Sequence, residues 1–169
     1  MQLFRVVLIL PLALLLAGCF TSDKPLIAPG EADFPFKSFT YHEVGEDSPE
    51  TFVRSGDIYV PSPDPNEGGR VELTFKKLPS GHYLAQLTGD RNDKNEVIYL
   101  YAVIALDEGT KTAHAYKLMR RDEDIGPGLR DCPDQRICVD DLAAYVALGE
   151  AAIAAGGKPD ATYQITATE

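Results

Sequence analysis

The sequence has no tryptophan, two methionines, three histidines and three cysteines among its 169 residues. Cations are also few, since 16 Lys and Arg stand against 26 Asp and Glu and leave a net charge of −10. Nucleic-acid phosphates require a basic surface, so this balance argues against a nucleic-acid partner. It also disfavours binding of anionic lipid headgroups by the folded domain. The negative charge keeps the chain soluble and permits a basic partner or a cation.

No apolar run is long enough to cross a membrane as a helix. The run at residues 6–17 has twelve residues, whereas a spanning helix needs about 20. It follows one cation, Arg5, and ends in small residues, which is the layout of a secretory signal peptide. Residues 1–18 are therefore predicted to be a signal peptide. An ordinary cleaved signal followed by an incidental cysteine is the alternative to the more specific interpretation that follows.

The segment Leu16-Ala17-Gly18-Cys19 resembles the lipobox of bacterial lipoproteins. The resemblance implies that the leader is cut before Cys19, that the Cys19 thiol carries a diacylglycerol, and that the new amino terminus is acylated in most species. Two or more acyl chains hold a protein stably on a membrane, whereas one holds it marginally. Phe20, and not Asp, follows the cysteine. In enteric bacteria Asp there retains a lipoprotein in the inner membrane, so the resemblance favours the periplasmic leaflet of the outer membrane.

Cleavage before Cys19 leaves a chain of the usual size for one domain. It removes only Arg5 among the charges, so the net charge changes from −10 to −11. Residues 19–35 are rich in Pro and Gly and lack a hydrophobic period, which predicts a flexible tether. Residues 36–169 are then expected to form a single globular α+β domain.

Alternating apolar and polar residues predict most of the strands. Residues 70–78 and 83–87 form a hairpin about the turn Pro79-Ser80-Gly81. Residues 97–106 are ten apolar residues and are expected to be a central strand that is covered on both faces. The remaining predicted strands are 37–44, 51–60, 111–119 and 162–166. The polar segment 88–96 is expected to be a solvated loop.

One helix is predicted near the C-terminus. Asp140 or Asp141 can cap its start, and Gly156-Gly157 can end it. Its apolar stripe comprises Leu142, Tyr145, Val146, Gly149 and Ile153, and alanines on its other face suit close packing on a sheet. The expected fold is α+β: an antiparallel, curved or partly closed sheet of about six to eight strands, one C-terminal amphipathic helix and a final strand.

Cys132 and Cys138 are an even pair once Cys19 is lipidated, and an exported chain meets an oxidising compartment. A Cys132–Cys138 disulfide is therefore predicted. The spacing differs from the Cys-x-x-Cys of thiol oxidoreductases, and no histidine lies at metal-ligand spacing from either thiol. No metal or other cofactor is expected.

The segment Ser80-Gly81-His82-Tyr83 is similar to the Ser-Gly-x-x-Tyr element of periplasmic lysozyme inhibitors, one residue shorter. Those inhibitors include small acidic lipoproteins built on an antiparallel barrel. The resemblance implies that Ser80, His82 and Tyr83 contact a basic enzyme.

The main functional prediction is a membrane-anchored cell-envelope lipoprotein whose domain is not an enzyme. It would bind an envelope protein or a cell-wall component, or support an assembly. One alternative is capture of a basic envelope enzyme such as lysozyme. A second is a hydrolase whose site is assembled from scattered residues such as His82, His114 and Asp107. Gly-x-Ser-x-Gly, complete calcium loops and phosphate loops are all absent from the sequence.

Overall fold

The structure, a computed structural model, describes residues 19–62, 71–91, 96–118, 121, 125–132 and 136–168, so the predicted signal peptide lies outside the described residues. This part of the chain forms eleven strands and one helix. The strands are β1 (Phe20–Ser22), β2 (Ser38–Glu43), β3 (Glu50–Ser55), β4 (Ile58–Pro61), β5 (Val71–Lys77), β6 (Tyr83–Arg91), β7 (Glu96–Asp107), β8 (Thr112–Tyr116), β9 (Leu129–Asp131), β10 (Ile137–Val139) and β11 (Ala161–Thr168). The helix is α2 (Leu142–Ala154).

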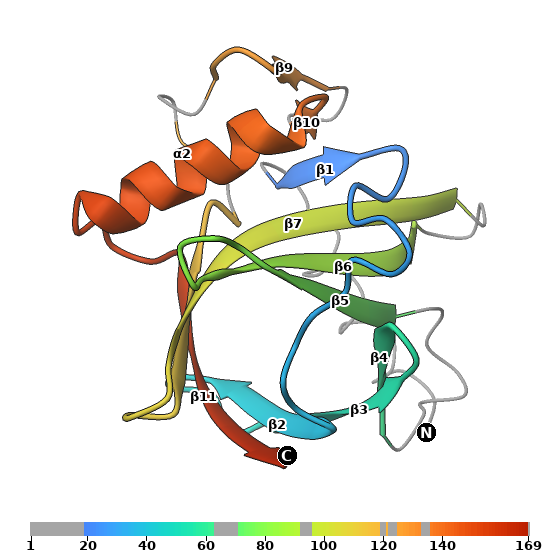
Figure 1. Ribbon diagram of the computed structural model, residues 1–169, viewed down its shortest axis with the longest axis vertical. Helices are drawn as coiled ribbons and strands as arrows, with labels where there is room; N and C mark the ends of the chain where they lie inside the picture. The colour runs from blue at the N-terminus through green and yellow to red at the C-terminus, as the bar shows by residue number, and fades with distance from the viewer. Residues whose placement is uncertain are drawn as a thin grey trace, which may run out of the picture.

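Eight strands close into an antiparallel barrel. They follow the order β6-β5-β4-β3-β2-β11-β8-β7, and β6 pairs back to β7 to complete the closure. Strands β1, β10 and β9 continue the sheet outside the barrel from the edge of β7 (Figure 1). The predicted α+β fold is confirmed, with a sheet that is fully closed.

Strand β7 serves both the barrel and the outer strands because it is twelve residues long. One of its edges pairs with β6 from Glu96 to Ile104. The other edge pairs with β8 at its C-terminal half and with β1 near its N-terminal half. Tyr101 and Val103 are at most 1% exposed and Ala102 is 7% exposed, so both faces are covered. The predicted central strand is confirmed.

Aromatic side chains fill the barrel interior. An eight-stranded barrel encloses a space that side chains can occupy completely. Phe34 lies at the centre of this cluster, with its ring stacked on Phe75 at a centroid distance of 4.1 Å. The buried members of the cluster are Phe34, Phe39, Phe52, Tyr59, Phe75, Tyr83 and Ala85.

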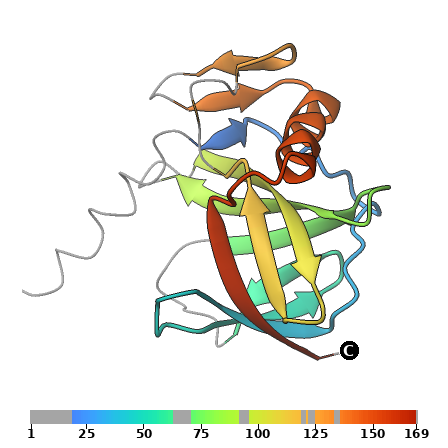
Figure 2. The ribbon, with the colours of Figure 1, turned by 90° about the vertical axis from the view of Figure 1, so that its left-hand side faces the viewer.

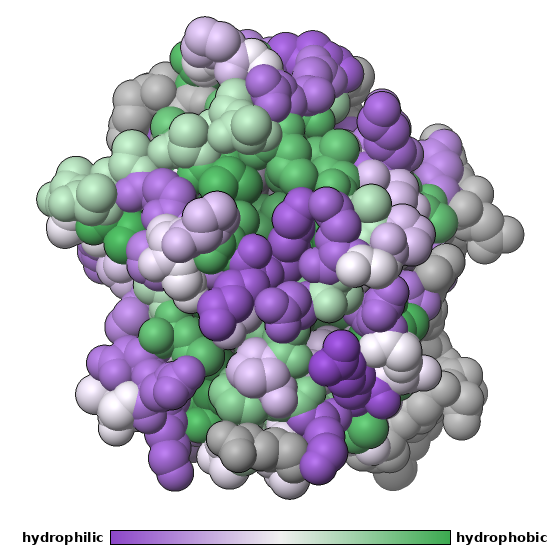
Figure 3. All heavy atoms as spheres, in the orientation of Figure 1, coloured by the Kyte–Doolittle hydropathy of each residue, from purple (hydrophilic) through white to green (hydrophobic). Residues whose placement is uncertain are grey.

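Helix α2 packs on the outside of the barrel, against β7 and β8 (Figure 2). Asp141 caps its start, since the Asp141 carboxylate accepts from the Ala143 and Ala144 amides. Tyr145 and Gly149 are its buried residues, which confirms the predicted helix and cap. The alanines, in contrast, do not form the contact with the sheet. Exposed alanines at 143, 147, 151 and 154 face outward, and their pale green spheres mark the helix in Figure 3.

Two strand predictions need correction. Residues 51–60 form two strands and not one, because Gly56 has a φ of +66° and turns the chain between β3 and β4. The polar segment from Thr88 is largely strand, since β6 continues to Arg91. Thr88 pairs with Tyr99 and is 5% exposed. Pairing with a long neighbouring strand outweighs the polar sequence here.

The predicted tether is also different in the structure. Residues 20–22 are strand β1, and residues 23–37, here called the strap, run from β1 past β5 and β6 to β2 (Figure 1). Phe20, Ile27 and Phe34 are at most 5% exposed, because each apolar side chain enters one of the two main cores. Residues 19–35 therefore belong to the folded domain, which was predicted to begin at residue 36.

Candidate functional site

Ser80 and His82 come together with Glu150 at the turn between β5 and β6. Gly81 allows this turn with a φ of +95°. The Ser80 hydroxyl donates to Glu150 Oε1 at 2.6 Å, and His82 Nδ1 lies 2.8 Å from Glu150 Oε2. The His82 and Glu150 side chains are each 27% exposed. One carboxylate on α2 thus binds both polar side chains of the turn.

The order of these three groups differs from that of a nucleophilic triad. In a triad the imidazole lies between the hydroxyl and the carboxylate, so that it can take the hydroxyl proton. Here the Glu150 carboxylate lies between Ser80 and His82. What Ser80 Oγ accepts from His82 is its backbone amide, at 3.2 Å, and not its imidazole. A carboxylate is an acceptor only, so the pairing places a proton on His82 Nδ1. The arrangement joins the turn to the helix.

Tyr83, the third predicted binding residue, lies inside the barrel. It is 5% exposed, and its ring meets that of Phe34 edge-on at 5.1 Å. Burial raises the pKa of the Tyr83 hydroxyl, and the charges of Asp33 and Glu108 act in the same direction. Of the three predicted contacts, only Ser80 and His82 therefore reach the surface.

The residues of the hydrolase alternative have separate partners. His114 Nδ1 lies 3.1 Å from the Thr162 hydroxyl oxygen. The Asp107 carboxylate accepts from the Gly109 and Thr110 amides at 2.9 and 3.2 Å. Hydrogen bonding from Thr110 lowers the pKa of Asp107, with a smaller contribution from the charge of His114. Among the described residues, no hydrogen bond joins His82, His114 and Asp107 to one another.

Cys19 lies at the start of β1 and is tied into the sheet. Its carbonyl oxygen accepts the Ile137 amide at 3.1 Å. The residue is 5% exposed, and burial raises the pKa of the Cys19 thiol while the charge of Arg136 acts in the opposite direction. The next residue, Phe20, packs its ring on Tyr145 of α2 at 5.1 Å.

A buried polar network holds the strap next to β1. The Tyr101 hydroxyl lies 2.8 Å from Ser22 Oγ and accepts the Leu26 amide at 3.2 Å. Gln86 Oε1 accepts the Leu26 and Ile27 amides at 3.0 and 3.2 Å. Burial raises the pKa of Tyr101 to about 12.

Sequence reasoning missed Glu150, Gln86 and Tyr101 as partners. Glu150 carries a signal that could have revealed it, because it is the one charged residue in α2. Gln86 and Tyr101 carry no such signal. Gln86 takes a polar place in the alternation of β6, and Tyr101 lies in the continuous apolar run of β7, so their roles depend on the strap that lies over them.

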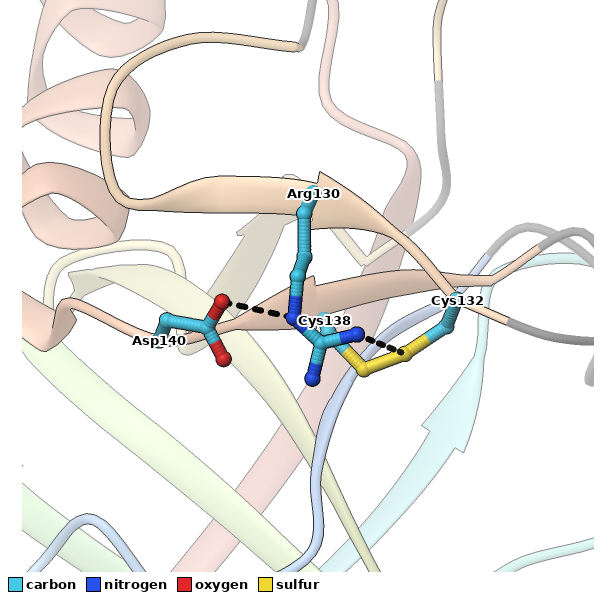
Figure 4. Close-up of a disulfide and its surroundings, with 4 residues drawn as sticks. All are labelled: Arg130, Cys132, Cys138 and Asp140. Carbon is cyan, nitrogen blue, oxygen red and sulfur yellow. Dashed lines mark hydrogen bonds and ion pairs between the residues drawn. A yellow bond between two sulfur atoms is a disulfide. The ribbon is translucent and has the colours of Figure 1, made fainter.

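The predicted disulfide between Cys132 and Cys138 is confirmed, with Cα atoms 5.4 Å apart. It connects the ends of the β9–β10 hairpin (Figure 4). Arg130 lies beside it, with Nε 2.7 Å from Asp140 Oδ2 and one terminal nitrogen 3.8 Å from Cys132 Sγ. The arginine side chain thus spans from the disulfide to the residues that precede α2.

A hollow of about 140 Å³ lies beside β1 and is lined by Ser22, Asp23, Glu96, Val97, Ile98 and Arg136. Within the described ranges, no three His, Cys, Asp or Glu side chains gather as a metal site. The described part of the chain also has no helix of the length and apolarity that a membrane span needs. Comparison with family models, with curated proteins and with solved structures finds no match.

Proposed function

We propose that this chain is a cell-envelope lipoprotein, anchored through a lipid on Cys19 and facing the periplasm, whose barrel domain binds a partner without catalysing a reaction. One observation carries the proposal. The segment Leu16-Ala17-Gly18-Cys19 ends immediately before β1, whose first residue is Phe20. Cleavage before Cys19 would therefore remove the leader and leave every described element intact.

The burial of Cys19 gives an order of events. A thiol reacts as its thiolate, and burial disfavours that form at Cys19. Transfer of the diacylglyceryl group to the Cys19 thiol therefore precedes the folding of β1 against β7 and β10.

Two features favour a binding role over catalysis. The Glu150 carboxylate is hydrogen-bonded to both Ser80 and His82, so neither the hydroxyl nor the imidazole is arranged to activate the other. The barrel interior holds a packed aromatic cluster around Phe34, which occupies the space that a substrate would need. A partner would therefore meet the outer surface. An envelope protein or a cell-wall component is proposed, with no cofactor and no nucleic acid.

Lipidation is tested by metabolic labelling in a bacterial host with an alkyne-tagged fatty acid, followed by mass spectrometry of the N-terminal peptide. The expected peptide begins at Cys19 and carries acyl chains. A Cys19→Ser variant should be unlabelled and retain its leader, whereas a Cys132→Ser, Cys138→Ser double variant should still be labelled. An unlabelled wild-type chain, or cleavage at another bond, would contradict the proposal.

Outer-membrane sorting is proposed from Phe20, in hosts that follow the enteric rule. Phe20 is 0% exposed, so the residue also has a packing role and a Phe20→Asp variant would report folding as well as sorting. The outer-membrane assignment is tested instead by expressing the unmodified sequence and separating the inner and outer membranes on a density gradient. Recovery with the inner-membrane fraction would refute the outer-membrane assignment and leave lipidation standing.

A further inference from the structure

The chain has no free length between Cys19 and the folded domain. Phe20 pairs with Ile137 of β10, and Thr21 pairs with both Cys138 of β10 and Leu100 of β7. Thr21 is only 1% exposed. Peeling β1 away would therefore break backbone pairing on both of its edges and expose the Phe20 ring.

The residues after β1 are held as firmly. The Ser22 hydroxyl bonds the buried Tyr101 hydroxyl, and Gln86 bonds the amides of Leu26 and Ile27. Further along the strap, the Asp33 amide donates to the Phe75 carbonyl oxygen at 2.8 Å. The strap between β1 and β2 therefore does not act as a flexible linker.

Three chain positions share one end of the outer strands. The parallel pairing of β1 with β10 and the antiparallel pairing of β10 with β9 place the start of β1, the start of β10 and the end of β9 together. Figure 2 shows these ends on the same side of the molecule. The residues there are Cys19, Asp131 and Arg136, of which only Asp131 is exposed.

On the premise that Cys19 is lipidated, we propose that the domain rests directly on the phospholipid bilayer in one orientation, with this end of β1, β10 and β9 against the lipid headgroups. Only the bonds of one cysteine side chain and a glycerol separate the sheet from the acyl chains. The C-terminal end of β11 lies on the opposite side of the molecule from these strand ends (Figure 2) and points into the periplasm. The surface open to a soluble partner is therefore on that side and not at the strand ends.

The orientation follows from the attachment and not from charge. The domain is acidic overall, and Arg130 at this edge is already paired with Asp140 at 2.7 Å. Attraction to an anionic surface is therefore weak. The inference consequently predicts an orientation that persists at high salt, unlike that of a protein held by basic residues.

The absence of tryptophan makes the test direct, because a single substitution introduces the only indole. Asp131→Trp and Thr168→Trp are both at exposed positions, one at the β9 end and one at the end of β11. Each lipidated variant is reconstituted into vesicles of phosphatidylethanolamine and phosphatidylglycerol that carry a headgroup spin label. Quenching of the indole should be several-fold stronger for Asp131→Trp, at low and at high salt. Equal quenching at both positions, or stronger quenching at Thr168→Trp, would overturn the proposed orientation.

A linker variant provides the matched control. Inserting about ten Gly and Ser residues between Cys19 and Phe20 adds a coil that spans roughly 18 Å. The lipidated linker variant should still float with vesicles but lose the difference between the two positions, and a difference that survives would overturn the attachment argument. A Cys19→Ala chain should not float. If the wild-type chain carries no lipid and does not float, the proposed function fails, whereas flotation without an orientation difference refutes only this inference.

Discussion

Gly149 of α2 lies directly against Val103 of β7. A Cβ atom built on Gly149 would lie 2.3 Å from Val103 Cγ2 and 2.7 Å from Val103 Cβ, far inside van der Waals contact. The closest approach of the helix to the barrel therefore depends on the absence of one side chain. The contact lies beside Tyr145, whose ring meets Phe20 of β1, so it also supports the layer that contains β1.

The change Gly149→Ala should destabilise the domain by about 1–3 kcal/mol, because the added methyl group overpacks the contact with Val103. The sign is informative, since the same change at an exposed helical position would stabilise by about 0.5–1 kcal/mol. Urea denaturation gives the free energy of unfolding. Adding Val103→Ala should recover part of the loss, and a stabilised single variant would refute the close contact.

The change Glu150→Gln should loosen the β5–β6 turn. It removes charge-assisted bonds to Ser80 and His82 from a partly exposed site, so a loss of about 0.5–1.5 kcal/mol is expected. Thermal unfolding of Glu150→Gln, Ser80→Ala and the double variant measures the coupling. The double variant should cost less than the sum of the two single changes, and simple additivity would argue against a shared bond.

The change Phe34→Ala should destabilise by about 3–5 kcal/mol, because it leaves a void at the centre of the aromatic cluster. Pro35→Ala is the matched control: the neighbouring position is exposed, and the loss of a proline there should change the free energy of unfolding by about 1 kcal/mol or less. A flexible tether would make both substitutions neutral. Denaturation of the two variants side by side therefore decides whether the strap is part of the fold.

Alkaline conditions should weaken the domain through Tyr101. Its pKa is raised to about 12 from the ordinary value of 10.0, so the folded state keeps a proton that the unfolded state releases. The stabilisation is complete below pH 10 and declines as pH rises from about 10 to about 12, by up to about 1.4 kcal/mol per pH unit. Tyr101→Phe should flatten this decline. An unchanged slope in chemical denaturation at several pH values would contradict the assignment to Tyr101.

Local pattern predicted much of this protein. Alternation placed the β5–β6 hairpin, a continuous apolar run placed β7, and Asp141 marked the start of α2. The pairing of Cys132 with Cys138 was predicted from an even count and an expected export of the chain, and the structure contains it. These features depend on neighbours in the sequence or on composition, so they could be inferred without coordinates.

The tertiary structure decided the features that depend on distant partners. Closure of the barrel requires β6 to meet β7 on one side while β8 pairs the other edge, and no local pattern encodes that ring. Phe20, Ile27 and Phe34 are all buried, although Pro25, Pro29 and Gly30 interrupt any strand or helix period between them. Tyr83 lies in the core and Glu150 binds the turn for the same reason: burial and hydrogen bonding are determined by which segments meet. The sequence alone predicted a leader that ends before Cys19 and determined the kinds of elements that follow. Only the folded chain determined that the cysteine is joined to the barrel without a tether, because that depends on side chains of β6, β7, β10 and α2 closing around β1.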